Sequence, residues 1–368
     1  MVENSNDWKL GYVLANLKIK EPVESNSGAI ALVPFNDRRL TGIQTASNGA
    51  KKLLNGFHDM YGKPTCPSAI IYYESAPEGV KSIPAMVDFR NCVAMSYILP
   101  GWGQMDFAQI SSPSNPLWSD FFDFYPALVD SRDAISSINP AQEIFGGKNA
   151  PFEGMSSPYV TQPPGEFIVD TNLLSLLISK WEQRYVSPGT DKWDGRKLFR
   201  SLEMAYRVLS LPVKNEGSIH DFGSSIALWV SAFEILAHPE DGKVDKTVVF
   251  ELLRKAPSWY YEELLDKRFE VQTRKGKLSA TLVERLYDDL YNARNAFLHG
   301  NTIDVDVWRY KGKTIQIALE NLAPVLYRTA LMSYLGGPLP TSETDDDIIR
   351  AYCDQIYEDF LMQVLDVQ

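Results

Sequence analysis

The sequence predicts an α+β protein, in which a mixed α/β domain is followed by an all-helical domain. The chain has 368 residues, which exceeds the usual size of a single hydrophobic core. Short β-compatible apolar runs occur within residues 1–135, whereas helical spacing of apolar residues prevails from residue 166 onward. Residues 136–165 hold five prolines with several glycines and serines, as is typical of a linker or a long surface loop. We therefore divide the chain into domain 1–135, linker 136–165 and domain 166–368.

The first domain is expected to mix strands with helices. Apolar runs suggest strands at Tyr12–Ile19, Ala29–Val33 and Ala69–Tyr73, and helical spacing suggests a helix at Thr41–Tyr61. Ala85–Leu99 is apolar enough to be either a buried helix or a helix–strand pair. Neither a GxGxxG nor a GxxxxGKS/T pattern occurs here, so the sequence does not predict a nucleotide-binding loop.

The second domain is expected to be almost wholly helical. Its predicted helices are Phe167–Tyr185, Asp194–Leu211, Ser224–Ala237, Val244–Lys255, Leu278–His299, Ile315–Leu335 and Asp345–Leu365. Pro212 and Pro239 would end the second and the third of these helices. The Thr341–Asp347 run is rich in capping and acidic residues, which favour the positive end of the last helix.

Composition limits the kinds of partner and location. The formal charge of −11 excludes a protein that coats nucleic acid non-specifically, so any nucleic-acid contact must be local. The apolar run Ile226–Ala237 is too short to cross a membrane, and the N-terminus lacks the pattern of a signal peptide. The three cysteines form no CxxC pair and predict no disulfide framework. We therefore expect a cytoplasmic protein that does not contact a membrane.

The predicted helix Leu278–His299 is the most informative element, because its residues separate into three faces at about 100° per residue. One face is apolar and is expected to contact the core of its own domain: Leu286, Leu290, Ala293 and Phe297. The opposite face is polar: Asp288, Asn292, Asn295 and His299. A third stripe lies between them: Tyr287, Tyr291, Arg294 and Leu298. Because tyrosine and arginine are common at interfaces, we expect this stripe to contact a second copy of the chain around a twofold axis, through Tyr287, Tyr291 and Leu298.

His299 is expected to be the last helical residue, because Gly300 follows it in a typical C′ position. Carbonyl groups at a helix end lack intrahelical donors, and the macrodipole there favours a cation. A histidine in this place suits a general acid that works near neutral pH. The alternative, that His299 only satisfies carbonyl groups at the helix end, stays open.

The segment Arg294-Asn295-Ala-Phe-Leu-His299 resembles the Arg-x(4–6)-His signature of the HEPN superfamily, in which a polar residue follows the arginine. The match lies at the end of a long predicted helix in an all-helical domain. Upstream, the segment SSIALWVSAFEILAHP is similar to the preceding helix of many HEPN domains, with Glu234 as its lone acid. The resemblance covers about residues 166–335 and leaves the N-terminal part uncovered.

HEPN domains are helical bundles that usually dimerise, and many are metal-independent ribonucleases. The resemblance implies that Arg294 binds the scissile phosphate, that His299 is the general acid/base, and that Asn295 orients the substrate or the histidine. The RNA 2′-hydroxyl would attack its own phosphate and leave a cyclic phosphate end. The resemblance therefore implies an endoribonuclease with an RNA substrate and a composite site in a homodimer. It implies no metal ion and no other cofactor, and the sequence holds no metal-binding cluster.

Other members of the superfamily have lost catalysis, so a non-catalytic module that binds RNA or protein as a sensor or scaffold is the alternative function. An N-terminal domain ahead of a HEPN domain is similar to prokaryotic antiphage and abortive-infection proteins. The resemblance thus implies antiviral defence or toxin-like growth arrest, with an activating ligand or a phage component bound by residues 1–135. A cyclic-oligonucleotide sensor, as in CRISPR-associated ribonucleases, is disfavoured because this region shows no clear strand–helix alternation.

Further residues are candidates for supporting roles. Glu234 lies in an otherwise apolar helix, and a buried carboxylate is costly unless it is paired. It would either position Arg294 or form a salt bridge elsewhere in the bundle. Asp288 on the polar face is the second supporting acid. Three basic residues before the motif helix would contact RNA phosphates or only form a solvated surface: Arg274, Lys275 and Lys277.

Overall fold

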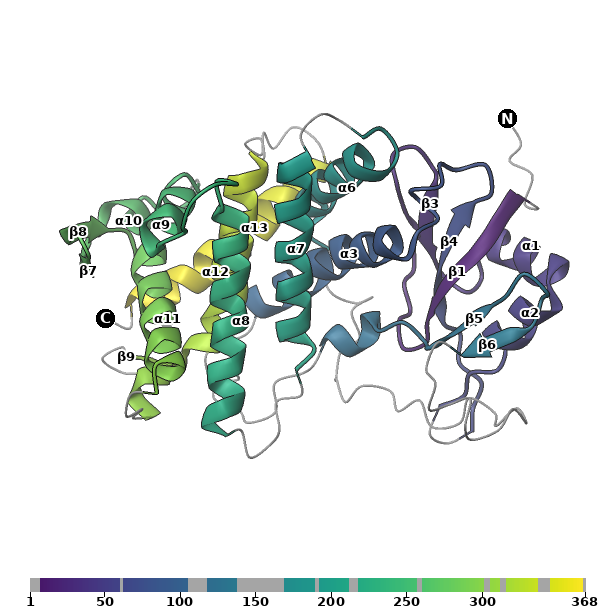
Figure 1. The fold of residues 1–368 in the computed structure, drawn as a ribbon, viewed down its shortest axis with the longest axis horizontal. Helices are drawn as coiled ribbons and strands as arrows, with labels where there is room; N and C mark the ends of the chain where they lie inside the picture. The colour runs from purple at the N-terminus through teal and green to yellow at the C-terminus, as the bar shows by residue number, and fades with distance from the viewer. Residues whose placement is uncertain are drawn as a thin grey trace. The chain divides into compact units, whose positions relative to one another are not determined.

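The computed structural model describes residues 7–59, 62–104, 118–137, 169–188, 192–211, 218–256, 260–300, 305–311, 316–336 and 345–366. These residues form a small antiparallel sheet near the N-terminus and mostly helices after it, which confirms the predicted α+β class (Figure 1). The chain clusters into two compact units. The first unit comprises Met1–Ala94, Pro116–Phe167 and Ile178–Thr190, and the second comprises Met95–Asn115, Ile168–Leu177 and Asp191–Gln368.

Two helices contribute residues to both units, so the chain passes between the units more than once. They are α3 (Ile83–Gly103) and α6 (Thr171–Tyr185). Helix α3 is continuous, which decides between the two alternatives for Ala85–Leu99 in favour of a buried helix. Most of the predicted linker lies outside the described residues, because these stop at residue 137 and resume at residue 169.

The first unit is built on a four-stranded antiparallel sheet with the strand order β1-β4-β3-β2. Its strands are β1 (Trp8–Leu14), β2 (Val23–Glu24), β3 (Ile30–Val33) and β4 (Ser68–Tyr73). One face of the sheet shares a hydrophobic cluster with two short helices and a hairpin, namely α1 (Arg38–Ala46), α2 (Asn48–Leu54) and β5 (Ala127–Val129) with β6 (Ile135–Ser137). The 3₁₀ helix η2 (Trp118–Phe122) precedes the hairpin.

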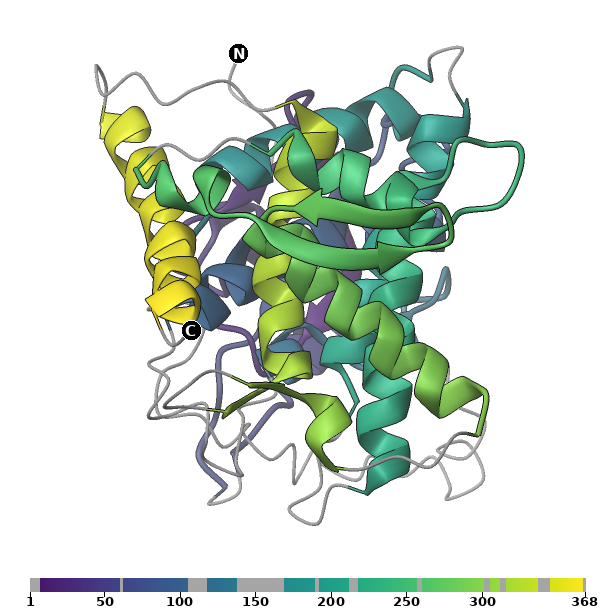
Figure 2. The same cartoon turned by 90° about the vertical axis from the view of Figure 1, so that its left-hand side faces the viewer.

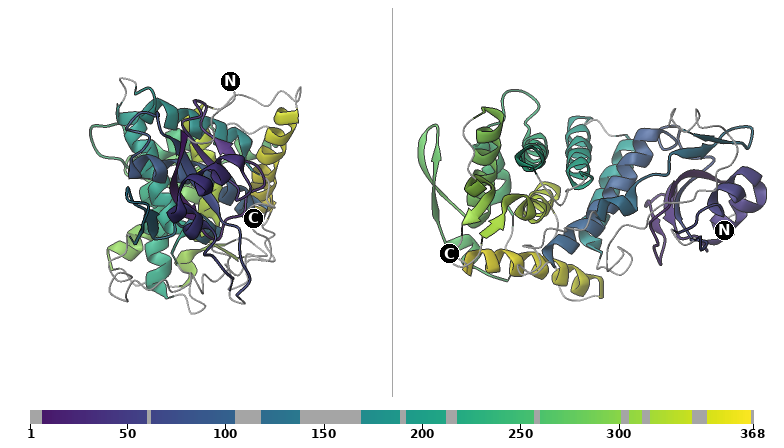
Figure 3. Two further views of the ribbon diagram at one scale, coloured as in Figure 1. Left: turned by 90° about the vertical axis from the view of Figure 1, so that its right-hand side faces the viewer. Right: turned by 90° about the horizontal axis from the view of Figure 1, so that it is seen from below.

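The first turns of α3 cover the opposite face of this sheet (Figure 3). The Sδ atom of Met86 lies 3.0 Å from the position that a Cβ atom on Gly11 would take, so a glycine in β1 allows this close approach. The sheet is therefore covered on both faces. This burial accounts for the nearly continuous apolar sequence of β3 and β4.

The single helix predicted over Thr41–Tyr61 is wrong, because α1 and α2 are separate helices. Ser47 lies between them in an extended conformation, and its hydroxyl accepts a hydrogen bond from the Ala50 N–H. A serine side chain in this position caps the second helix and so ends the first. The predicted strands at Ala29–Val33 and Ala69–Tyr73 are confirmed as β3 and β4, each within one residue. The strand predicted at Tyr12–Ile19 overlaps β1 only at its end, because β1 begins at Trp8 and ends at Leu14.

The second unit is a helical bundle, and every predicted helix has a counterpart. After α6 its helices are α7 (Lys192–Leu209), α8 (Ile219–Ala237), α9 (Lys246–Arg254), α10 (Glu263–Asp266), α11 (Leu282–Leu298), α12 (Leu319–Leu335) and α13 (Asp345–Asp366). Helices α8, α11 and α12 enclose an aromatic core. Phe233 lies 5.1 Å from the Tyr287 ring and 5.5 Å from the Tyr327 ring, measured between centroids. This core holds α11 beside α8.

The prediction of an almost wholly helical second domain is wrong in two places, where β-hairpins occur. Hairpin β7 (Phe269–Thr273) with β8 (Gly276–Ala280) precedes α11 and crosses in front of it (Figure 2). Hairpin β9 (Arg309–Lys311) with β10 (Gln316–Ala318) follows the 3₁₀ helix η4 (Val305–Trp308) and precedes α12. Helix α11 therefore begins at Leu282 rather than Leu278. Its apparent N-terminal extension is a strand whose residues alternate between half-buried and exposed positions before the buried Ala280.

Helix α13 begins at Asp345, inside the acidic run that was predicted to cap it. The earlier residues of that run, 341–344, lie outside the described residues. No helix in the described part of the chain is long and apolar enough to cross a membrane.

Candidate active site on helix α11

Both ends of α11 are fixed by local hydrogen bonds. At its start, the Thr281 hydroxyl accepts from the Glu284 N–H, and the Glu284 carboxylate accepts from the Thr281 N–H at 2.7 Å. Buried Glu284 also pairs with Arg254 of α9 at 2.7 Å. At its end, His299 is the C-cap and Gly300 has φ +67°, a left-handed conformation that glycine adopts without strain. The predicted helix end at His299 and Gly300 is thus confirmed.

Arg294 is held against α8. Its Nη2 lies 3.6 Å from Oε2 of Glu234, and its Nη1 donates to Oδ1 of Asn295 at 3.2 Å. The predicted contact between Glu234 and Arg294 is therefore present. Burial raises the pKa of the Glu234 carboxyl, and the charge of Arg294 opposes this rise. The Nε atom of Arg294 is buried without a hydrogen-bond partner among the described residues, so part of its donor capacity is unused.

His299 is exposed at the end of α11. Within the described part of the chain no hydrogen bond or ion pair to its imidazole is formed, and none joins it to Arg294. The two residues are five positions apart, which places their side chains about 140° apart around the helix axis. A single chain therefore brings Arg294 together with Glu234 and Asn295, and leaves His299 separate.

Asp288 does not lie on an open polar face beside His299, and that prediction is wrong. Its carboxylate is buried, pairs with the Lys246 ammonium of α9, and accepts a hydrogen bond from Asn292 Nδ2 at 3.2 Å. Helix α9 and the β7–β8 hairpin cover this half of α11, which a helical projection of α11 alone does not show. The neighbouring Asp289 pairs with Arg285 at 3.1 Å, and burial raises its pKa to about 6.

Tyr287 does not lie on the surface, so its predicted place at a subunit contact is wrong. Its side chain is 0% exposed and lies in the aromatic core of the second unit, tilted against Phe233 and edge-on to Phe250. Tyr291 is half-buried, with the Lys246 Nζ 5.7 Å and the Arg294 Cζ 5.9 Å from its ring centroid. Leu298 is 55% exposed and remains available for contact with another molecule.

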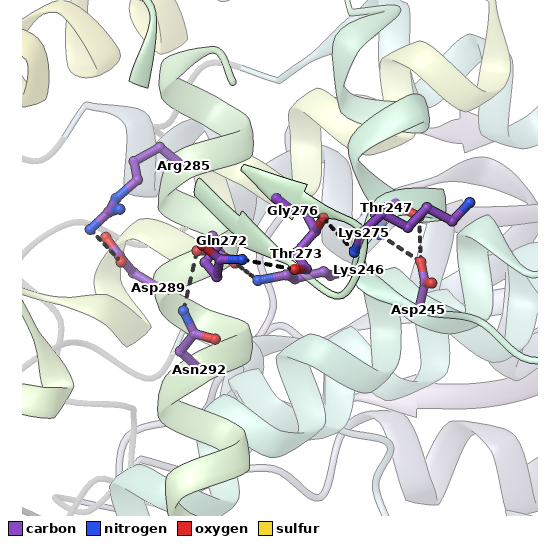
Figure 4. A network of polar contacts seen from close by, with 11 residues as sticks. Asp245, Lys246, Thr247, Gln272, Thr273, Lys275, Gly276, Arg285, Asp289 and Asn292 are labelled. Carbon is purple, nitrogen blue, oxygen red and sulfur yellow. Dashed lines mark hydrogen bonds and ion pairs between the residues drawn. The ribbon is translucent and has the colours of Figure 1, made fainter. Parts of the chain in front are cut away.

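The three basic residues before α11 belong to the β7–β8 hairpin rather than to a flexible segment. Arg274 and Lys275 are exposed in its turn, and the Thr273 hydroxyl donates to the Gly276 carbonyl across this turn (Figure 4). Lys277 pairs with Glu270 on the opposite strand at 2.7 Å. No contact among the described residues links this cluster to Arg294 or His299.

The sequence prediction missed the contact that fixes the last turn of α11. A Cβ atom on Gly223 of α8 would lie 2.3 Å from Cδ2 of Phe297, so the backbone of α8 lies directly against this ring. His220 and Trp308 flank the same ring at centroid distances of 6.2 Å and 6.1 Å. The signal in the sequence was a glycine within a helical pattern, which often marks a close approach. The prediction started this helix at Ser224 and so left the glycine out.

No cluster of three or more histidine, cysteine, aspartate or glutamate side chains that could hold a metal ion occurs in the described part of the chain. Comparison of the chain with protein families, curated proteins and solved structures gives no match.

Proposed function

We propose that the chain is a metal-independent endoribonuclease of the HEPN type that acts as a homodimer. One observation carries the proposal: the end of α11 presents an arginine held by Glu234 and Asn295, followed by an exposed C-cap histidine. A planar guanidinium suits a phosphate, and an exposed imidazole suits proton transfer near neutral pH.

The proposed reaction needs only these side chains and the substrate. The 2′-oxygen of a ribose attacks the adjacent phosphorus, the bond to the 5′-oxygen of the next nucleotide breaks, and a 2′,3′-cyclic phosphate and a 5′-hydroxyl form. An imidazole accepts the 2′ proton or donates a proton to the leaving 5′-oxygen. Arg294 would bind the non-bridging oxygens, whose charge increases in the transition state. Asn295 would orient the guanidinium, which already donates to it.

A dimer is part of the proposal because one chain separates Arg294 from His299. Two copies of α11 around a twofold axis would bring Arg294 of one subunit to His299 of the other. Leu298 and Ile219 are exposed apolar side chains near the end of α11 and the start of α8, at 55% and 39% exposure. Because α8 and α11 are in contact there, these two residues are the proposed contact surface.

The first test is cleavage of mixed RNA by the purified protein in EDTA. Arg294→Ala and His299→Ala should each lower the rate by at least about a hundredfold, because they remove charge stabilisation and proton transfer. Arg285→Ala is the matched control, since Arg285 lies on the same helix and, among the described residues, pairs with Asp289 rather than with the residues of the site. Cleavage by both site variants at the wild-type rate would refute the proposal, as would products without a cyclic phosphate end.

The second test asks whether the site is shared between subunits. A heterodimer of one Arg294→Ala subunit and one His299→Ala subunit retains one intact composite site. Random mixing of the two inactive variants should therefore restore about a quarter of the wild-type activity. No recovery, although the subunits exchange, would show that the site is not built in this way.

A second candidate is a module that binds RNA or protein without cleavage. The ion pair between Arg294 and Glu234 favours it, because it partly neutralises the guanidinium that catalysis needs. Saturable RNA binding without cleavage would select this candidate.

We also propose a role in antiviral defence, with the first unit as the sensor. The free thiols of Cys66, Cys92 and Cys353 support a reducing compartment such as the cytoplasm.

A further inference from the structure

The first unit contains a hollow of about 660 Å³ beside its outermost strand, β1. The hollow lies between β1, helix α1, the start of α2 and the turn of the β5–β6 hairpin, which Figure 1 shows around the same edge of the sheet. Apolar side chains of its lining include Leu10, Ile43, Ala46 and Val129, and charged side chains include Lys9 and Lys81. All of these residues belong to the first unit.

The backbone of β1 is unpaired where it borders the hollow. The Glu74 N–H donates to the Asp7 carbonyl at 2.8 Å, so residue 7 forms a hydrogen-bonded pair across the β1–β4 ladder. Hydrogen-bonded and non-hydrogen-bonded pairs alternate in an antiparallel ladder. Lys9, two residues after Asp7, therefore forms the next hydrogen-bonded pair, with Tyr72, while Trp8 and Leu10 belong to non-hydrogen-bonded pairs. The N–H and C=O groups of Trp8 and Leu10 then point away from β4. No described backbone group pairs with them.

The side chains around this edge differ between the two faces of the sheet. On the face that carries Leu10, the hollow is bounded by Ile43 and Ala46 of α1 and by Val129 of β5. On the face that carries Lys9, it is bounded by Tyr72 and Glu74, and Lys81 also lines it. An added strand would alternate its side chains between an apolar side and a charged side that holds the two lysines.

We propose that the free edge of β1 binds an extended peptide of a partner protein by β-strand addition. The peptide places an apolar side chain against Ile43, Ala46 and Val129, and the neighbouring acidic side chain beside Lys9 and Lys81. Its backbone pairs with the N–H and C=O groups of Trp8 and Leu10. This inference does not depend on the proposed ribonuclease activity.

An acidic side chain of the peptide would replace the present partners of the two lysines. Lys9 lies 3.3 Å from Glu74, and Lys81 lies 2.7 Å from Glu78. Both partner carboxylates are more than half exposed, so these two surface pairs are weak and exchangeable.

The two carboxylates of the hairpin turn, Asp130 and Asp133, already accept hydrogen bonds from backbone N–H groups of the protein. The Asp133 carboxylate accepts from the backbone N–H groups of Asn48 and Gly49 at 2.9 Å and 3.1 Å. Asp130 likewise accepts from two backbone N–H groups of its own turn.

The experiment uses the full chain and a fluorescein-labelled, end-capped peptide of alternating glutamate and valine. Fluorescence anisotropy should give saturable binding with a Kd below about 1 mM. At saturation, hydrogen exchange of the Trp8 and Leu10 amides should slow by at least about tenfold, while the Lys9 amide, already paired with Tyr72, stays unchanged. Two peptide controls should not bind: one with lysine in place of glutamate, and one N-methylated at alternate residues.

Two protein variants sharpen the test. Ala46 is exposed at the end of α1, so Ala46→Trp fills the hollow without altering the core and should weaken binding by at least about tenfold. Lys9→Glu should weaken it by about fivefold. The inference is overturned by an absence of saturable binding, by equal binding of the lysine peptide, or by unchanged binding to Ala46→Trp. Concentration-dependent protection of the two amides without peptide would also overturn it, because the occupant would then be a second copy of the chain.

Discussion

Gly223→Ala is the most informative substitution, because one added methyl group tests the contact that fixes the end of α11. Its carbon would lie 2.3, 2.4 and 2.5 Å from Cδ2, Cε2 and Cγ of Phe297. Carbon atoms normally approach to about 3.5–4.0 Å, so the ring must withdraw by about 1 Å. The neighbouring rings of His220 and Trp308, at centroid distances of 6.2 Å and 6.1 Å, restrict this movement. We expect a loss of about 1–3 kcal/mol in the free energy of unfolding, as is usual for overpacking.

The sign of the effect should reverse when the ring is removed. In a Phe297→Ala background the methyl group has space, and replacing a mid-helix glycine with alanine should stabilise the protein by about 0.5–1 kcal/mol. The double-mutant cycle should therefore give a coupling energy of about 1.5–4 kcal/mol between the two positions. Gly195→Ala in α7 is the matched control. A Cβ atom on Gly195 meets nothing within 4 Å, so this variant should only gain stability.

The assay is native-state hydrogen exchange of the slowest amides in α8 and α11, which reports on this unit rather than on the whole chain. Two results would refute the reasoning. One is a Gly223→Ala variant that is as stable as the wild type. The other is an equal loss of stability with and without the Phe297 ring.

Two further predictions concern buried charges in the second unit. Burial raises the pKa of Glu320 from 4.5 to about 7, so the folded state keeps a proton that the unfolded state loses. The contribution of Glu320 to the free energy of unfolding is fully present below pH 4.5 and is lost as the pH rises through about 7. Glu320→Gln should therefore remove up to about 3 kcal/mol of the fall in unfolding free energy between pH 4 and 8, measured by denaturation. Arg328 joins the buried carboxylates of Asp170 and Asp354. Arg328→Met should cost about 3–5 kcal/mol in urea denaturation, whereas Arg207→Met, which breaks an exposed pair with Glu203, should cost less than about 1 kcal/mol.

Local sequence was sufficient to predict much of the helical unit, because helix ends are specified by nearby residues. Gly300 ends α11 as predicted, since only a residue that tolerates positive φ satisfies the carbonyl groups there. Asp170 caps α6 by accepting from the Leu173 N–H at 3.0 Å, and an aspartate before a helical pattern is a typical local signal for such a start. The cost of burying a carboxylate predicted that Glu234 has a partner, and the structure decided between the two alternatives in favour of Arg294.

Tertiary structure alone decided which faces of α11 are covered. Helical periodicity identifies one buried face, but it does not show whether distant segments cover the others. Helix α9 supplies Lys246 to Asp288, and the aromatic core encloses Tyr287, so two residues that looked like surface residues are buried. The β7–β8 hairpin was missed for a related reason. Strands of five residues are specified by their pairing and by the surface they cover, and both are properties of the folded chain.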